Sequence, residues 1–400
     1  MHRLLNSVRA YEWGSTTYLP DLLGQPRTGR PQAELWIGAH ALQPSMIDSG
    51  ESTHQSLLEL VASSPERQLG RGAAAKFSGR LPFLLKVLAV EQPLSLQLHP
   101  DALRAEIGFR AENAAGVDIS APERTYKDPY HKPELTYAVT AFETLCGFRR
   151  LEQSVTLLSG LTRHSPLPSF FAAALADLSA SDEQAAVHAV TARALALPRS
   201  EAGRCLDIVR RICPELGDDT ADAAAHLAER YPDDPGVLVT LLMNTVRLEP
   251  GQALFVRPGT LHTHLHGIAV EIQAGSDNTI RGGLTSKYVA VEQLLAGLDR
   301  TVGPVALEPE QQISATEVVF RPPVDEFQLS VLRTEAGSTT RWDAGRPRAV
   351  LVLDGEVSVR ERGRTITLAH GGSLFVPADA ERLEVSGTGT LVAATTGLHT

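Results

Sequence analysis

The chain has 400 residues, and its 37 Lys plus Arg against 47 Asp plus Glu give a formal net charge of −10. This acidity argues against a nucleic-acid-binding protein, which needs a basic face, and a hydrophobic content of 43% excludes a chain that is disordered throughout. No apolar run reaches the roughly 18 residues that cross a membrane, and three cysteines without a CxxC pair suit reduced thiols, so we expect a cytoplasmic protein of roughly two to four domains.

Short apolar runs separated by Pro and Gly turns fill the first 150 residues and predict strands, among them 83–90, 94–98 and 135–139. From about 151 to 247 the sequence becomes rich in Ala and Leu at helical spacing, which predicts helices. The strand pattern returns at about Glu249. It passes through a helical piece near 291–298 and resumes after about 314.

This order predicts a mainly β fold with an inserted α-helical domain. Residues 1–150 and 249–313 would form the first β-rich unit. Residues 151–248 would form the helical insertion, and 314–400 a second β-rich unit.

The two β-rich units share a local pattern. GQALFVRPGTLH ends in His262, whereas GGSLFVPADAER has Asp379 and Arg382 in the corresponding frame. Both segments resemble the second motif of the cupin barrel, in which a Gly, a Pro, a further Gly and a His follow at short intervals. We therefore predict two cupin-like jelly-roll barrels, of which the C-terminal one has lost its metal site.

PLSLQLHPD, residues 93–101, alternates leucines with polar side chains. The alternation places Gln97 and His99 on one face of a strand, opposite the leucines. An amide and an imidazole facing a barrel interior suit a metal or sugar site. An amphipathic strand with its polar face in water is the alternative, and the pattern alone favours it.

Two further segments offer metal ligands. Glu134 follows Pro133 at the entry to a strand, so rigid backbone would hold it, although a charged surface loop is the alternative there. In LHTHLHG, period two places His262, His264 and His266 on one strand face. Neighbouring histidines on one face lie about 6–7 Å apart, so at most one or two of them should bind the same zinc ion.

A last segment, VEIQAGSDNTIRGGLTSK, runs from Val270 to Lys287. Its charged and amide side chains surround a Gly-rich turn and suit the neutralisation of a phosphate and the positioning of a hydroxylated substrate. These side chains are Glu271, Asp277, Asn278, Arg281 and Lys287.

Taken together, the motifs resemble those of the type I mannose-6-phosphate isomerase family, also called phosphomannose isomerases. Seven blocks match in order: YEWGS, AELWIGAH, LPFLLKVL, PLSLQLHPD, YKDPYHKPE, FETLCGFR and EIQAGSDNTIRGGLTSK. They cover about the first 150 residues and Glu249–Leu298. The helical block and the C-terminal unit match in placement rather than in motif.

The resemblance implies a catalytic cupin barrel, a helical domain inserted after its first half, and a C-terminal cupin-like barrel. It also implies one zinc ion per chain, bound by Gln97, His99, Glu134 and His262. These ligands would leave the site with a charge of about +1, so that the ion acts as a Lewis acid. The family usually has Tyr where this chain has His264, which makes His264 a competing candidate for the metal.

The implied reaction is the reversible isomerisation of mannose 6-phosphate and fructose 6-phosphate through a cis-enediol. Glu271 is the first candidate for the base, because burial can raise the pKa of a carboxyl group toward neutrality. His131 and Lys132 are alternatives for proton relay, while Lys132 and Arg281 would stabilise charge near the zinc. The residues that would handle the substrate and its phosphate are Ser95, Lys86, Lys287, Asp277 and His264, together with Arg281.

Three other functions compete with this one. A non-catalytic sugar-binding cupin would be expected to have lost some of the implied site residues, yet the four zinc ligands are present, as are Lys132, Glu271 and Arg281. A cupin oxygenase would usually need a redox-active metal and three or more His or carboxylate ligands facing an open position; the Gln ligand and the sugar-phosphate motifs argue against it. An isomerase of a related aldose phosphate is the third, because His264 lies beside the site. We expect a monomer, since no sustained heptad or exposed apolar strand indicates a partner surface.

Overall fold

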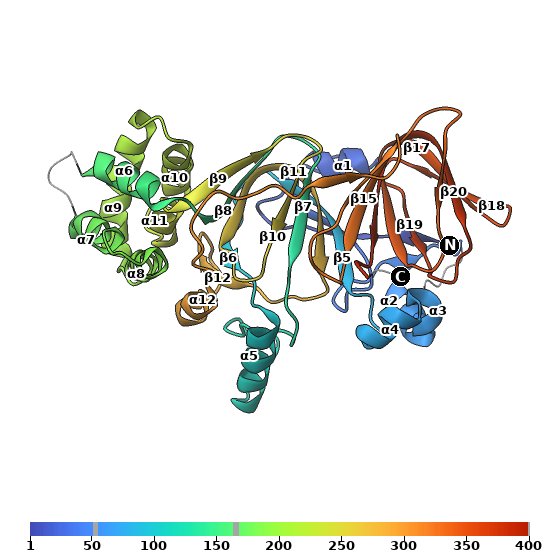
Figure 1. Cartoon of the computed structure of the whole chain (residues 1–400), viewed down its shortest axis with the longest axis horizontal. Coiled ribbons are helices and arrows are strands. Elements are labelled where there is room, and N and C mark those ends of the chain that lie inside the picture. Colours follow the sequence, from blue (N-terminus) through green and yellow to red (C-terminus); the bar gives the residue numbers. More distant parts are fainter. Residues whose placement is uncertain (51–54, 163–167, 399–400) are drawn as a thin grey trace.

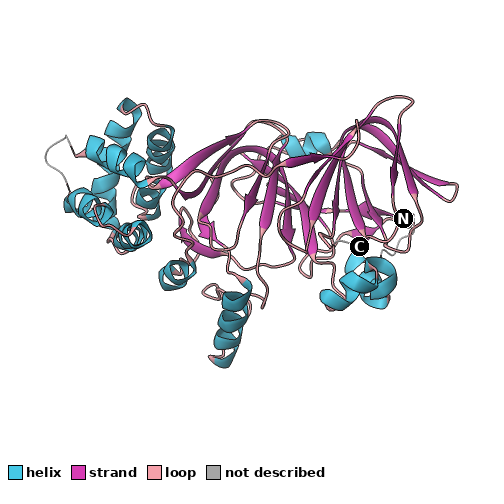
Figure 2. Ribbon diagram, viewed as in Figure 1, coloured by secondary structure: helices cyan, strands magenta, loops and turns pink. Residues whose placement is uncertain are grey.

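The computed structural model describes residues 1–50, 55–162 and 168–398. Two ten-stranded antiparallel sheets form the body of the structure, and a group of helices lies at one end (Figures 1 and 2). The prediction of a mainly β chain is confirmed. None of the described helices is both long and apolar enough to cross a membrane.

The first sheet carries the candidate site. Its main path runs through β10 (Ala253–Val256), β7 (Glu134–Ala138), β11 (His262–Ala274), β5 (Phe83–Val90), β3 (Glu34–Ile37) and β2 (Ser7–Arg9). Four more strands lie off this path: β6 (Leu96–Leu98) and β8 (Phe142–Phe148) pair with β11, β12 (Ile280–Gly283) pairs with β6, and β9 (Met243–Leu248) pairs with β8.

The long strand β11 joins the two parts of this sheet. Its first residues pair with β6 and β8, and its residues from Gly267 onward pair with β5 and β7. Gly267 has a φ of 114°, and a Cβ atom there would lie 2.4 Å from the carbonyl oxygen of Ala141. Only glycine therefore fits where β11 passes from one pair of neighbours to the other.

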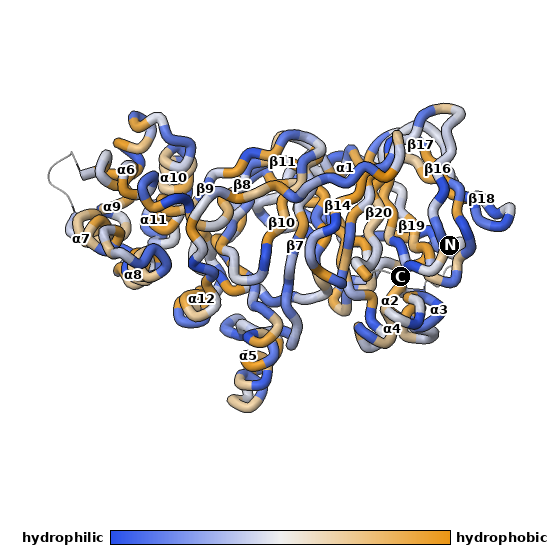
Figure 3. Tube along the Cα trace, in the orientation of Figure 1, coloured by the Kyte–Doolittle hydropathy of each residue, from blue (hydrophilic) through white to orange (hydrophobic). Residues whose placement is uncertain are grey.

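The second sheet follows the order β13 (Glu310–Gln312), β14 (Glu317–Phe320), β15 (Gln328–Thr334), β20 (Leu383–Thr395), β17 (Arg348–Glu361), β19 (Ser373–Val376), β1 (His2–Leu5) and β4 (Met46–Ile47). β16 (Thr339–Trp342) pairs with β20, and β18 (Arg364–Ala369) with β17. Figure 3 shows apolar residues along β10 and β19 and polar residues along β18.

The two sheets share an apolar core. One cluster of buried side chains includes Leu85 and Ile272 of the first sheet and Leu329, Leu351 and Phe375 of the second. Alternation along β5 and β11 then turns Lys86 and Glu271 to the opposite face of the first sheet. The shared core thus fixes which face of the first sheet is left for polar chemistry.

Six helices lie between β8 and β9, where the Ala- and Leu-rich spacing predicts helices (green in Figure 1). They are α6 (Leu151–Leu161), α7 (Ser169–Leu178), α8 (Glu183–Leu195), α9 (Arg199–Ile212), α10 (Asp219–Arg230) and α11 (Gly236–Thr240). The helical piece near 291–298 is α12 (Val291–Gly297).

Five helices of the first half are absent from the sequence-based expectation: α1 (Tyr18–Leu22), α2 (Leu57–Ser63), α3 (Pro65–Leu69), α4 (Arg71–Lys76) and α5 (Ala102–Ala114). Two of them have a local start signal. Ser56 and Glu59 form a capping box before α2, and the Asp101 side chain accepts a hydrogen bond from the Arg104 N–H before α5. Ala105 is the one buried residue of α5, so this helix lacks the apolar periodicity from which helices are predicted.

Two features of the expected architecture differ from the structure. The pairings among the described strands run from β10 to β2 and from β13 to β4, so neither sheet closes into a barrel. β1 and β4 lie within 1–150 and β13 within 249–313, yet all three belong to the second sheet. The limits of the three domains stay a prediction.

Candidate metal centre

Three buried side chains from three strands of the first sheet meet at one point. His99 directly follows β6, Glu134 begins β7 and His262 begins β11. The Nε2 atom of His99 lies 3.2 Å from one carboxylate oxygen of Glu134, and that of His262 lies 3.5 Å from the other. Among the described residues, these three form the one group whose ligand atoms all lie within 4.8 Å of one another.

Both imidazole rings are oriented by backbone carbonyl groups. The Nδ1 atom of His99 lies 2.6 Å from the carbonyl oxygen of Asn278, and that of His262 lies 3.0 Å from that of Thr260. A carbonyl oxygen only accepts hydrogen bonds, so each Nδ1 carries the proton and each Nε2 lone pair faces the centre.

The charge state of the group suits a metal. The Nε2 atom of His99 is buried and has no hydrogen-bond partner. Burial lowers the pKa of His99 to about 4, so the ring is neutral at pH 7. Burial alone would raise the pKa of Glu134, but His99 and Lys132 outweigh it and hold the pKa well below its usual value. The neutral His99 ring, the second imidazole of His262 and an ionised carboxylate are a donor set that zinc accepts.

Gln97 stands beside this group. It lies directly opposite His262 in the strand pairing, and its Nε2 atom is 3.5 Å from His262 Nε2. Its Oε1 atom accepts a hydrogen bond of 2.9 Å from the Ser95 hydroxyl group. Exchanging the two ends of the amide turns the oxygen to the histidines, and the Ser95 hydroxyl then accepts instead of donating. Gln97 thus fits as a fourth, oxygen ligand.

His264 and His266 do not join the group. The Nδ1 atom of His264 lies 3.0 Å from the Thr144 hydroxyl oxygen, and its Nε2 atom lies 3.8 Å from Glu271. A register shift between positions 264 and 266 leaves His266 exposed, so the expectation of three histidines on one face is wrong for His266. The structure does not place His264 as a competing ligand.

A cavity of about 600 Å³ opens beside the metal group. It gathers most of the residues expected from the sequence: Lys86, Ser95, Gln97, Lys132, Glu134, His264, Glu271, Asp277, Arg281 and Lys287. Several lining residues were not expected as site residues, among them Arg9, Glu34, Gln273, Thr285 and Arg230. Glu34 lies inside the matched AELWIGAH block, so the sequence could have indicated it as a site residue. Arg230 is the last residue of α10 and belongs to no matched block, so the sequence offered no indication of it.

Strand register explains the arrangement around Lys86. Trp36, Lys86, Glu271 and Thr136 lie opposite one another on β3, β5, β11 and β7. The Nζ atom of Lys86 is 3.1 Å from Glu271 and 3.7 Å from Glu34. Burial lowers the pKa of Lys86, but these carboxylates outweigh it and raise the pKa above its usual value. Lys86 is therefore already paired, which makes it a poor phosphate ligand.

The Lys86–Glu271 ion pair also contradicts the expectation that the pKa of Glu271 is raised toward neutrality. Burial and Glu134 raise its pKa, but Lys86 and a hydrogen bond to His264 outweigh them, so the pKa is lowered rather than raised. Glu271 is an ionised carboxylate, able to accept a proton.

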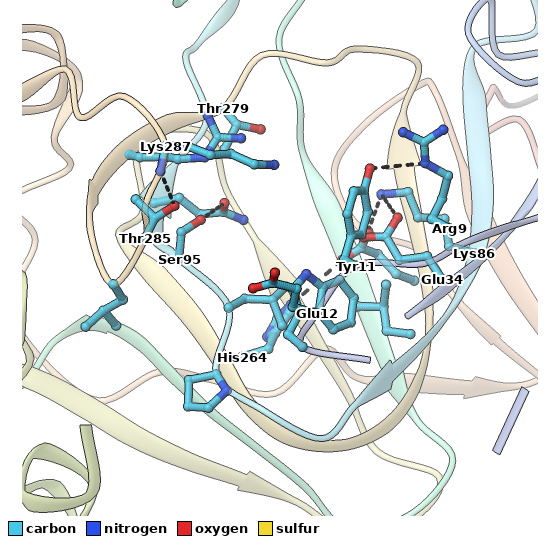
Figure 4. A pocket seen from close by; sticks show the side chains of 18 of the residues that line it. Arg9, Tyr11, Glu12, Glu34, Lys86, Ser95, His264, Thr279, Thr285 and Lys287 are labelled. Carbon is cyan, nitrogen blue, oxygen red and sulfur yellow. Dashed lines mark hydrogen bonds and ion pairs between the residues drawn. The ribbon is translucent and has the colours of Figure 1, made fainter. Parts of the chain in front are cut away.

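Arg281 and Lys287 form an anion-binding end of the cavity. Neither has a carboxylate within 4.0 Å among the described residues, and burial lowers the pKa of both. Figure 4 shows Lys287, Thr285 and Ser95 on one side of the cavity and Arg9, Lys86 and Glu34 on the other. Two cations without an anionic partner suit a phosphate group.

His131 lies outside this cavity. Its Nε2 atom is 2.7 Å from Glu326, which lies between β14 and β15, and it lines a separate, smaller pocket. The structure therefore does not bring His131 to the site as a proton relay. Asp277 lines the cavity but is paired with His40 at 3.1 Å.

Asn278 is fully buried and holds the loop behind His99. Its side-chain oxygen accepts from the Lys127 N–H at 2.7 Å, and its nitrogen donates to the carbonyl oxygens of Asp128 and Tyr130, both at 2.8 Å. We predict that Asn278→Ala lowers the free energy of unfolding by about 2–4 kcal/mol, because buried groups lose their partners.

Zinc affinity should also fall in Asn278→Ala, by about 10–100-fold, because the Asn278 side chain holds in place the backbone carbonyl group that orients His99. Chemical denaturation and a competing-chelator titration measure the two effects. Asn244→Ala is the matched control: it removes hydrogen bonds of 2.9 and 3.2 Å to the carbonyl oxygens of Gly303 and Cys146, and should cost stability while sparing zinc affinity. Unchanged zinc affinity in Asn278→Ala would contradict the orienting role.

Comparisons with known proteins agree with this geometry. Two family models match the chain, "Phosphomannose isomerase type I, catalytic domain" over residues 1–151 and "Mannose-6-phosphate isomerase, cupin domain" over residues 319–396. A mannose-6-phosphate isomerase from Salmonella typhimurium is 36% identical over 397 residues, which cover 98% of both proteins.

Solved structures agree as well. A crystal structure of zinc-bound mannose 6-phosphate isomerase matches with a TM-score of 0.90 at 35% identity and covers 99% of both chains. Another, bound with zinc and yttrium, matches with a TM-score of 0.90 at 36% identity and covers 100% of both.

Proposed function

Because the chain belongs to the type I phosphomannose isomerase family, we propose that it interconverts mannose 6-phosphate and fructose 6-phosphate through a cis-enediol. The observation that carries the proposal is one cavity beside the His99–Glu134–His262 group. It is lined by the Lys86–Glu271 pair and by two cations that have no carboxylate partner among the described residues.

Gln97, His99, Glu134 and His262 would hold one zinc ion per chain. A bound zinc ion supplies Lewis-acid stabilisation for negative charge on the sugar oxygens. Lys132 lies 3.1 Å from Glu134 and adds a positive charge at the same end.

Arg281 and Lys287 would hold the phosphate group at the anion-binding end of the cavity, with the Ser95 and Thr285 hydroxyl groups as further donors. Binding at that end orients the sugar, so that carbons 1 and 2 lie toward Glu271. Such fixed placement converts proton transfer into a step within one complex.

Glu271 would move the proton between the two carbons. Its carboxylate removes the proton from carbon 2, and the electron pair of that C–H bond forms the carbon–carbon double bond while the carbonyl oxygen gains a proton. Return of the proton to carbon 1, with loss of the hydroxyl proton at carbon 2, gives the ketose. Lys86, 3.1 Å away, keeps Glu271 ionised and oriented.

A coupled assay for fructose 6-phosphate tests the proposal, run on the protein as purified, after chelation, and after zinc is restored. We expect turnover of mannose 6-phosphate to disappear with the chelator and to return with zinc. A folded, zinc-loaded protein without turnover would contradict the proposal and leave a sugar-binding cupin.

Turnover of a different aldose phosphate alone would indicate an isomerase with another substrate. His264 favours this second candidate, because it stands where the family usually has Tyr and its side chain lines the cavity. The centre of its ring lies 5.1 Å from the centre of the Phe142 ring.

A further inference from the structure

Asp234 is a buried carboxylate that binds the backbone of the cavity wall. It lies between α10 and α11 and is 5% exposed. One carboxylate oxygen accepts a hydrogen bond of 2.8 Å from the Gly236 N–H, and the other accepts one of 2.8 Å from the Leu284 N–H. The Thr285 N–H also bonds to this carboxylate. No Lys or Arg side chain among the described residues lies within ion-pair distance of it.

The segment that Asp234 holds has an unusual backbone. Leu284 has a φ of 55°, in the left-handed region that a residue with a branched side chain rarely adopts. Such a conformation persists only where the surroundings fix it. The hydrogen bond from the Leu284 N–H to Asp234 is an interaction that does so.

Close packing of two glycines supports the same contact. A Cβ atom on Gly283 would lie 2.6 Å from a carboxylate oxygen of Asp234 and 2.8 Å from Gly236 Cα. A Cβ atom on Gly236 would lie 2.9 Å from the carbonyl oxygen of Gly282. The loop before α11 and the end of β12 therefore touch through their backbones.

The residues immediately after this contact line the cavity. Thr285, Ser286 and Lys287 follow Leu284, and the Nζ atom of Lys287 lies 5.3 Å from the centre of the Tyr11 ring. Lys287 has a long, rotatable side chain, so the position of its charge depends on the backbone that carries it.

We propose that Asp234 is a positioning residue for the substrate phosphate: from the helical segment it fixes the Leu284–Lys287 turn, so that Lys287 and the neighbouring donors meet the anion. This inference rests on the proposed phosphate-binding role of Lys287. It gives the helical segment a part in substrate binding although Asp234 itself does not touch the substrate.

A double-mutant cycle tests the inference with inorganic phosphate as the probe, its Kd measured by calorimetry on the zinc-loaded protein, together with KM and kcat for mannose 6-phosphate. We expect Asp234→Asn to weaken phosphate binding and raise KM at least about tenfold, because small displacements of binding groups are costly. The values of kcat and zinc content should not change. In the Lys287→Met background, Asp234→Asn should have little further effect.

Asp233→Asn is the matched control, since Asp233 is adjacent, carries the same charge and makes only a surface ion pair of 3.6 Å with Arg199. Gly283→Ala is a second variant that disturbs the same contact. Measurement well below the melting temperature of each variant separates binding from stability.

Unchanged phosphate affinity in a folded Asp234→Asn protein, or full additivity with Lys287→Met, would overturn the inference. Unchanged affinity in Lys287→Met alone would instead refute the phosphate-binding role of Lys287 on which it rests.

Discussion

Glu271→Gln is expected to lower kcat for mannose 6-phosphate by about 10²–10⁴-fold, the usual contribution of a positioned proton-transfer group. The amide keeps the size of the side chain and can still accept a hydrogen bond from Lys86, but it cannot take a proton. Zinc content should be retained, because Glu271 is not one of the three grouped metal ligands. Steady-state kinetics and metal analysis on the same preparation measure the two quantities.

Glu34→Gln is the control for this variant. Glu34 also contacts Lys86, at 3.7 Å, so its loss changes the charge around Lys86 without removing the proposed base. We expect a much smaller loss of turnover than in Glu271→Gln. Near-normal turnover in Glu271→Gln would reject Glu271 as the base.

His99→Ala is expected to abolish both zinc binding and turnover. Removing an outer partner of a metal ligand already costs about 10–100-fold in metal affinity, so loss of a direct ligand should cost more. His99 is fully buried and its Nε2 atom faces the group without a hydrogen-bond partner, so no other side chain replaces it. Zinc content after dialysis against a weak chelator measures the effect.

His264→Ala and His266→Ala are the matched controls, because both histidines lie on β11 with His262 but outside the group. Both should retain one zinc ion per chain. Loss of zinc from His264→Ala with retention in His99→Ala would contradict the assignment of ligands.

The sequence predicts the strand-rich segments and the helical block well, because both depend on the spacing of apolar residues over short stretches of chain. Residues 83–90 form β5 over the expected range. α5 is missed because it protrudes from the body and buries little, so it carries no apolar stripe. The placement of β1 beside β19 could not be expected, since it depends on a partner more than 360 residues away along the chain.

The candidate site shows the same limit. Alternation put Gln97 and His99 on a polar face, and the family motifs added Glu134 and His262, but their convergence depends on strand register. Register also decides that Lys86 lies opposite Glu271, which reverses the expected direction of the Glu271 pKa shift. Local charge composition cannot reveal such cross-strand neighbours.

The pairing of β1 with β19 has a consequence for synthesis of the chain. His2 lies opposite Phe375, so the earlier strand must wait until more than 360 further residues have been synthesised before it can pair. Contacts between residues so far apart in sequence slow folding, because a long loop must close before they form. Until then β19 would lack a neighbour along one side, and unpaired strand edges promote aggregation. β1 thus protects one side of β19, and a fragment that lacks β1 would leave that side unpaired.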